Sequence, residues 1–234
     1  MHIRKRGDHT KALFFKRTIS AQIHFLTFAL ALYGFLILLP YAVKLGGLHF
    51  WGTIAFGATA MLVFLISSVY HFLHDGYQVS EKLAAVMEHL DHSAIYLFIA
   101  GTYTPVLLNT IAPPWRNILM IGVWVLALLG IGYTLLKHRL PLWAQSRAVY
   151  TSMFVIMGCL FLFRVTESWS HFNTLGLFCL IAGAVSYVSG AVVYARKKPQ
   201  LYEGVFGFHE LWHLLSATGF AFHFAMVCSF YIYK

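Results

Sequence analysis

Long apolar runs alternate with short polar stretches along almost the whole chain. Seven of these runs approach or exceed the length of about 20 residues that a helix needs to cross the hydrocarbon core of a bilayer. Glycine, proline and charged residues separate them, so we expect each run to form one membrane span. The pattern predicts an all-α integral membrane protein, a seven-transmembrane helix bundle, with spans at approximately 19–43, 50–72, 90–112, 116–137, 148–166, 172–195 and 209–232.

The composition agrees with this assignment. Hydrophobic residues make up 59% of the 234 residues and charged residues only 11%, which is typical of a membrane protein and not of a soluble domain. Once the spans and their connecting loops are assigned, too few residues remain for a separate soluble domain. We predict a basic cytoplasmic tail at residues 1–17, followed by one transmembrane domain at residues 18–234.

The distribution of positive charge predicts the orientation of the bundle. Most lysines and arginines lie in the N-terminal tail and in the second, fourth and sixth loops, which places these segments in the cytoplasm and the C-terminus outside. An odd number of spans is then required, and seven satisfies this. The net charge of +9 would suggest a nucleic-acid partner for a soluble protein, but here it indicates attraction to anionic lipid headgroups and no nucleic acid.

Three polar clusters lie at the ends of predicted spans, where ionisable side chains are costly and usually functional. They are Ser67 to His71, Asp91 with His92, and His209 to His213. The predicted topology puts the end of the second span and the starts of the third and seventh on the cytoplasmic side. All three clusters are therefore expected at the same depth in the membrane.

The residue types in these clusters indicate a metal site. His209 and His213 are four residues apart on one helix face, and His71 comes from a second span, so three imidazoles can bind one ion. Three histidines leave a fourth position open, as in catalytic zinc sites, although manganese or iron would also accept such ligands. Asp91 is suited to hold water or to accept its proton, and it can also cap the third span.

A second interpretation concerns the run from His209 to His213, which matches the pattern H-E-x-x-H. In that pattern Glu210 would be the general base of an intramembrane metalloprotease, but the short motif is weak and leaves His71 and Asp91 unexplained. The other histidines are assigned elsewhere. His74 and His89 are predicted in a solvated loop, His92 beside a neighbour or headgroup, and His24 and His223 in contacts between helices.

The chain resembles the hemolysin III family, whose relatives include the progestin and adiponectin receptors and the alkaline ceramidases. The matching stretches are Ser67–His71, Leu90–Ser93 with Ala100–Pro105, and His209–His213 with His223 and Phe224. The resemblance implies a zinc ion held by His71, His209 and His213. It also implies that Asp91 and Ser67 lie beside that ion or its water.

The function expected from these residues is hydrolysis of a lipid amide or ester at the inner leaflet, with Asp91 and Ser67 as catalytic residues and zinc as cofactor. The expected partners are membrane lipids and a lipid substrate or ligand, in a bacterial cytoplasmic (inner) membrane. A non-enzymatic regulator or receptor-like protein with structural zinc is the main alternative, and a cytolysin is a third. The sequence does not indicate the oligomeric state.

Overall fold

The computed structural model describes residues 18–77, 79–203 and 205–231. This part of the chain is helical and contains no strand. The predicted basic tail at residues 1–17 lies outside the described residues.

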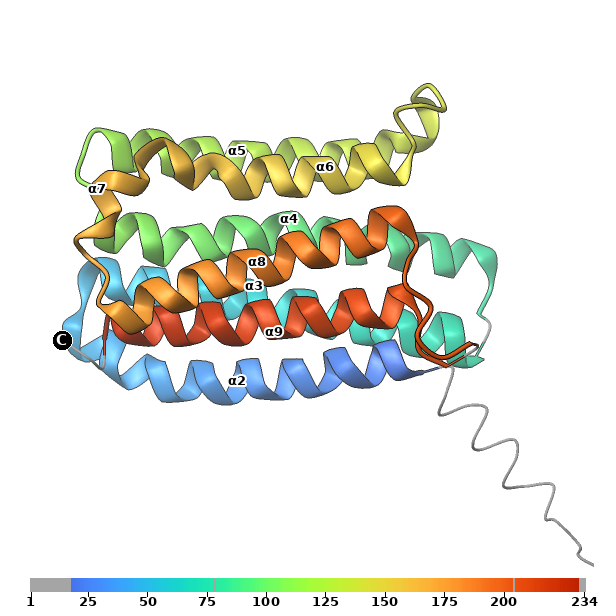
Figure 1. Ribbon diagram of the computed structural model, residues 1–234, viewed down its shortest axis with the longest axis horizontal. Coiled ribbons are helices and arrows are strands. Elements are labelled where there is room, and N and C mark those ends of the chain that lie inside the picture. Colours follow the sequence, from blue (N-terminus) through green and yellow to red (C-terminus); the bar gives the residue numbers. More distant parts are fainter. Residues whose placement is uncertain (1–17, 78, 204, 232–234) are drawn as a thin grey trace, which may run out of the picture.

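Within the described residues, seven long helical segments follow one another, some of them made of several elements. They are α2 (Ile19–Leu45), α3 (Gly47–His71) with the π-helix η1 (Phe72–Tyr77), α4 (Glu81–Thr110), α5 (Trp115–Leu136) with the 3₁₀ turn η2 (Lys137–Arg139), α6 (Arg147–Gly158) with η3 (Cys159–Arg164) and α7 (Val165–Trp169), α8 (Thr174–Arg196), and α9 (Phe208–Ser229). The segments run side by side along the long axis of the molecule (Figure 1). The end of α3 and the starts of α4 and α9 meet at one end of the bundle.

Six of the helical segments described here are long and apolar enough to cross a membrane. They are Ile19–Leu45, Gly47–Tyr77, Trp115–Arg139, Arg147–Trp169, Thr174–Arg196 and Phe208–Ser229. The protein is therefore a multi-pass helical membrane protein. The remaining long helix, α4, is less apolar because charged residues occupy its first turns and threonines occur in its second half. The count of seven spans and the orientation of the termini stay predictions.

The third and fifth segments show the largest differences from the sequence prediction. Helix α4 begins at Glu81 instead of near residue 90, because the Ser80 hydroxyl accepts a hydrogen bond from the Leu83 amide and caps the helix. The predicted fifth span is not one continuous α-helix. The hydroxyl of Tyr103 donates to the carbonyl of Gly158 at 2.6 Å and accepts from the amide of Phe161 at 2.9 Å, at the point where α6 changes into η3.

An aromatic cluster joins α3, α4 and α9 within the bundle. Phe64 lies 5.6 Å from Phe98 and 5.2 Å from Phe220, measured between ring centroids, and Phe56 stacks on Phe220 at 5.8 Å. Burial of such rings and their edge-to-face packing stabilise the contact between the three helices. The same three helices carry the three polar clusters, so this packing fixes the clusters relative to one another.

Close approach of α3 and α4 depends on Gly101, which provides the first prediction. A Cβ atom at Gly101 would meet the side chain of Thr59 and would lie 2.9 Å from the carbonyl oxygen of Ala55. The backbone of α3 at Ala55 cannot move away from this Cβ without separating the two helices. We therefore expect Gly101→Ala to lower the free energy of unfolding by about 1–3 kcal/mol. Gly122→Ala is the control, since a Cβ there meets nothing within 4 Å. Thermal unfolding of both variants in detergent would measure the difference, and equal midpoints would contradict the prediction.

Candidate metal centre

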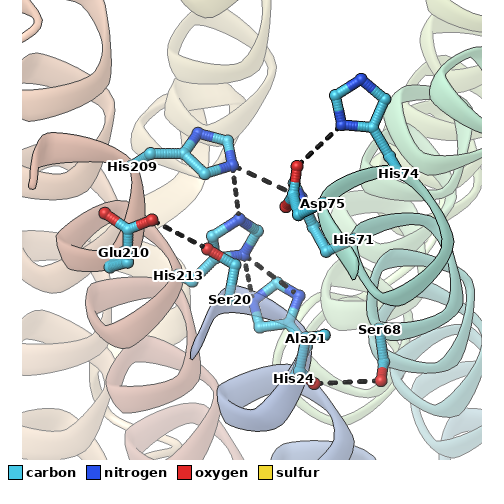
Figure 2. A network of polar contacts seen from close by, with 10 residues as sticks. All are labelled: Ser20, Ala21, His24, Ser68, His71, His74, Asp75, His209, Glu210 and His213. Carbon is cyan, nitrogen blue, oxygen red and sulfur yellow. Dashed lines mark hydrogen bonds and ion pairs between the residues drawn. The ribbon is translucent and has the colours of Figure 1, made fainter. Parts of the chain in front are cut away.

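Three buried or half-buried histidines converge where α3 and α9 meet. His71 is the last residue of α3, and His209 and His213 lie on the first two turns of α9. Nε2 of His209 lies 3.4 Å from Nε2 of His71 and 3.0 Å from Nε2 of His213 (Figure 2). One nitrogen from each residue lies within 4.8 Å of the other two. The predicted ligand residues are thus brought together, and the group could hold a metal ion.

The separation of these nitrogens fits a small transition-metal ion. Ligands bound at 2.0–2.1 Å in a tetrahedral arrangement are separated from each other by about 3.3 Å. The two nearest separations, 3.4 Å and 3.0 Å, bracket this value. Three imidazoles also form a donor set that such ions accept. The residues present therefore fit a metal ion with three protein ligands.

The histidine group borders an open cavity of about 940 Å³. His71 and His209 line this cavity together with Asp91. His213 lies deeper, with only 2% of its surface exposed, and does not line the cavity. A molecule that enters the cavity would therefore reach one side of the histidine group, while helices cover the other side.

Asp91 and Ser67 are both buried, and Asp91 lines the cavity together with His71 and His209, while the catalytic roles expected of Asp91 and Ser67 stay predictions. Asp91 is 7% exposed and Ser67 is 2% exposed. The Ser67 hydroxyl donates a hydrogen bond to the Asp91 carboxylate, and Asp91 lies near His71. Asp91 lies within α4 and not at its start, so it does not cap the helix. The capping role considered for Asp91 is therefore wrong, and the carboxylate is free to face the cavity.

Two further residues lie next to the histidine group: Asp75, which the sequence did not indicate, and His24, whose predicted contact between helices is confirmed. Asp75 accepts from Nδ1 of His71 at 2.9 Å, and its second oxygen lies 2.7 Å from Nδ1 of His74. On the other side, the nitrogens of His24 lie 2.9 and 3.3 Å from Nδ1 of His213. Figure 2 shows both residues directed at the histidine group. The i,i+4 spacing of His71 and Asp75 was a usable signal, but residues 74–88 were assigned to a loop.

Glu210 has a structural position within the H-E-x-x-H run. One of its oxygens accepts from the Gly207 amide at 2.8 Å, which caps α9, and the other accepts from the Ser20 hydroxyl at 3.4 Å. Both oxygens therefore have donors from the protein. This arrangement favours a role for Glu210 in shaping the start of α9.

Three other histidines that the sequence predictions placed lie within α4 and α9. His223 contacts the Leu180 carbonyl of α8 at 3.3 Å, which confirms a contact between helices. His92 lies 3.8 Å from Glu88 and packs on the ring of Tyr150. His89 lies within α4 and not in a loop, so that prediction is wrong. Its ring lies 5.3 Å from that of His138.

The charges around the cavity are mostly acidic, with Glu81, Glu88 and Asp75 added to Asp91. Burial raises the pKa of Glu88. The 2.9 Å hydrogen bond from Lys137 and the positive charge of Lys137 lower it by more, so the pKa of Glu88 is below its ordinary value.

Arg147 is the one arginine or lysine among the described residues that line the cavity. Its guanidinium stacks over the Tyr194 ring at 4.4 Å, and its Nη1 is buried without a hydrogen-bond partner in the part of the chain that the structure describes.

These features define a class: a multi-pass helical membrane protein with a candidate three-histidine metal centre beside an open cavity that several charged residues line. The model of the family "Haemolysin-III related" matches residues 13–224. The chain therefore belongs to the haemolysin III family.

Individual relatives support this assignment. The chain is 34% identical to Hemolysin-3 of Bacillus cereus over 177 residues, which cover 76% of this chain and 73% of the relative. It is 30% identical to the Hemolysin-3 homolog of Bacillus subtilis (strain 168), with 76% of each chain covered. A human protein, monocyte to macrophage differentiation factor, is 27% identical over 76% of this chain and 69% of its own length.

Proposed function

We propose that this protein is a zinc-dependent hydrolase that cleaves a lipid amide or ester at the inner leaflet. The observation that carries the proposal is the shared cavity: two of the three candidate metal ligands and the buried carboxylate of Asp91 line the same open space. A metal centre used only for stability needs neither an open side nor a carboxylate next to it.

Zinc is the metal that fits the proposal best. It favours imidazole ligands, and three protein ligands leave the fourth position available, as in catalytic zinc sites. When bound, zinc would supply a Lewis acid for the substrate carbonyl and would lower the pKa of water in the cavity. His71, His209 and His213 would hold it.

The residues of the protein would perform the proton transfers. Water attacks the carbonyl carbon, the bond from carbon to nitrogen or oxygen breaks, and Asp91 takes the proton from water and delivers it to the leaving amine or alcohol. The hydrogen bond from Ser67 holds the carboxylate in place for both steps. Arg147, whose Nη1 has no hydrogen-bond partner among the described residues, offers a donor to polar oxygens of the substrate lipid.

The proposal includes a topology of seven spans, with the N-terminus in the cytoplasm of a bacterial cell and the protein in its cytoplasmic (inner) membrane. Helix α4 follows α3 at one end of the bundle and leads into α5 at the other end (Figure 1). If α3 and α5 both cross the bilayer, α4 must cross it as well. The concentration of positive charge in the N-terminal tail and even-numbered loops supports the orientation.

A metal-dependence experiment tests this function. We expect the protein purified in detergent to contain one zinc ion per chain and to hydrolyse at least one member of a panel of lipid amides and esters. Removal of zinc with a chelator should abolish the hydrolysis, and added zinc should restore it. Metal analysis by mass spectrometry and chromatography of the lipid products are the measurements. A zinc-loaded protein without hydrolysis across the panel would overturn the proposal.

A second candidate function is a non-enzymatic regulator of membrane lipid state in which zinc is structural. The observation that favours it is the linkage of three helices at the centre, with His24 from α2, His71 from α3 and His213 from α9. In that case removal of zinc would lower the midpoint of thermal unfolding, and no lipid would be hydrolysed.

A further inference from the structure

We propose that Asp75 and His24 form an outer shell that fixes the ring orientation and the tautomer of two metal ligands, His71 and His213. This inference rests on the metal binding proposed above. It assigns a function to two residues that do not belong to the histidine group itself. Metal-binding histidines commonly donate their second ring N–H to a carboxylate or another acceptor, which orients the ring and increases its basicity.

Asp75 determines which nitrogen of His71 is free. An ionised carboxylate only accepts hydrogen bonds, so the 2.9 Å contact places the hydrogen of the His71 ring on Nδ1. The lone pair of Nε2 is then available to bind a metal ion. That nitrogen faces Nε2 of His209 at 3.4 Å, on the side where the three rings converge. Asp75 therefore selects the tautomer that can bind a metal at the centre.

The position of Asp75 is itself held by its surroundings. It lies in the π-helix η1, which continues directly from the α3 turn that ends with His71. Short π-helical segments are rare and frequently occur at functional sites. The second carboxylate oxygen contacts Nδ1 of His74 at 2.7 Å, so the two oxygens are shared between two imidazoles. His74, which was predicted only to lie in a solvated loop, supports the carboxylate from outside.

His24 has the corresponding position behind His213. Nε2 of His213 lies 3.0 Å from Nε2 of His209, and its Nδ1 lies 2.9 Å from the nearest nitrogen of His24. If Nε2 binds the metal, Nδ1 carries the hydrogen and donates it to His24. His24 is 5% exposed, and its ring packs edge-on against Phe64, with ring centroids 5.1 Å apart. Helix α2 thereby contributes to the centre without supplying a ligand.

The test is zinc affinity measured by competition with a chelator of known affinity, on the full chain in detergent. We expect Asp75→Ala and His24→Leu each to weaken zinc binding about 10- to 100-fold. Asp75→Asn should weaken it less, because the amide oxygen still accepts from Nδ1 of His71. His74→Ala should also weaken it less than Asp75→Ala, because it removes only one contact to the carboxylate. Glu88→Gln is the matched control. It removes a carboxylate that lines the same cavity and that Lys137 holds in an ion pair, and its zinc affinity should stay close to that of the wild type.

A spectroscopic measurement separates this positioning role from a general structural effect. Nitrogen NMR of zinc-loaded protein with ¹⁵N-labelled histidine should show His71 and His213 with hydrogen on Nδ1 and metal on Nε2. In Asp75→Ala, the Nδ1 signal of His71 should change while that of His213 does not. His24→Leu should have the opposite selectivity. A loss of fold would change all histidine signals together.

The outcomes distinguish this inference from the proposed function. A wild-type protein without tight zinc binding would overturn both. Tight zinc binding in the wild type together with unchanged affinity in Asp75→Ala would overturn the outer shell alone. The side chain of Asp75 is 29% exposed, so its substitution is compatible with folding. If His24→Leu does not fold, His24→Asn is measured instead, with the same expected direction.

Discussion

His213→Ala is expected to abolish tight metal binding while the helix bundle stays folded. His213 is the most deeply buried of the three candidate ligands, and its Nε2 lies 3.0 Å from that of His209. Its removal leaves two imidazoles, from two different helices, which is too few to hold zinc against competing chelators. We expect the bound metal to fall from one ion per chain to a trace, as measured by mass spectrometry of dialysed protein.

The matched control for this variant is His223→Ala. His223 lies on the same helix and is also buried, but it is ten residues, or about 15 Å, further along the axis. Both substitutions remove a buried imidazole and leave a comparable space. His213→Ala also leaves His24 without its partner, which costs about 1–3 kcal/mol. Equal loss of metal in both variants would indicate general destabilisation, and retention of metal in folded His213→Ala would exclude His213 as a ligand.

The sequence predicted the centre because the positions of ligands in a membrane helix bundle are strongly constrained. Once the spans are assigned, each residue has an approximate depth, and His71, Asp91 and His209 all fall at span ends that are predicted to lie on the same side of the membrane. Helical spacing then places His213 on the face of His209. The depth of a residue in the membrane and the helix face on which it lies are together sufficient to predict that these residues meet. The structure confirms the grouping of the three histidines.

The outer contacts could not be predicted in the same way. Asp75 lies beyond the end of the apolar run, where hydropathy no longer distinguishes a helix from a loop, and the π-helix that carries it has no sequence signature. His24 lies inside the first span, and its contact with His213 depends on the rotation of α2 about its axis. That rotation is determined by packing, including the hydrogen bond from the Ser68 hydroxyl to the Ala21 carbonyl at 3.0 Å. Such packing between distant segments is not encoded in local periodicity.

Asp91→Asn is expected to lower the rate of lipid hydrolysis about 10²- to 10⁴-fold without loss of metal. Asparagine has nearly the same shape as aspartate and can keep the contact with Ser67, so the fold and the cavity should persist. It cannot accept a proton at neutral pH, and this is the step for which Asp91 is proposed. We expect zinc content and the unfolding midpoint to match the wild type, with the loss confined to turnover.

Glu88→Gln is the control that makes this result specific to one carboxylate. Glu88 lines the same cavity and precedes Asp91 by three residues on the same helix, but Lys137 holds it in an ion pair at 2.9 Å. Its substitution removes an equal charge from the cavity and should leave turnover near the wild-type rate. Equal losses in both variants would mean that the cavity requires its negative charge in general. Unchanged turnover in Asp91→Asn would transfer the proton-accepting role to another group, and the proposed reaction would then need a different base.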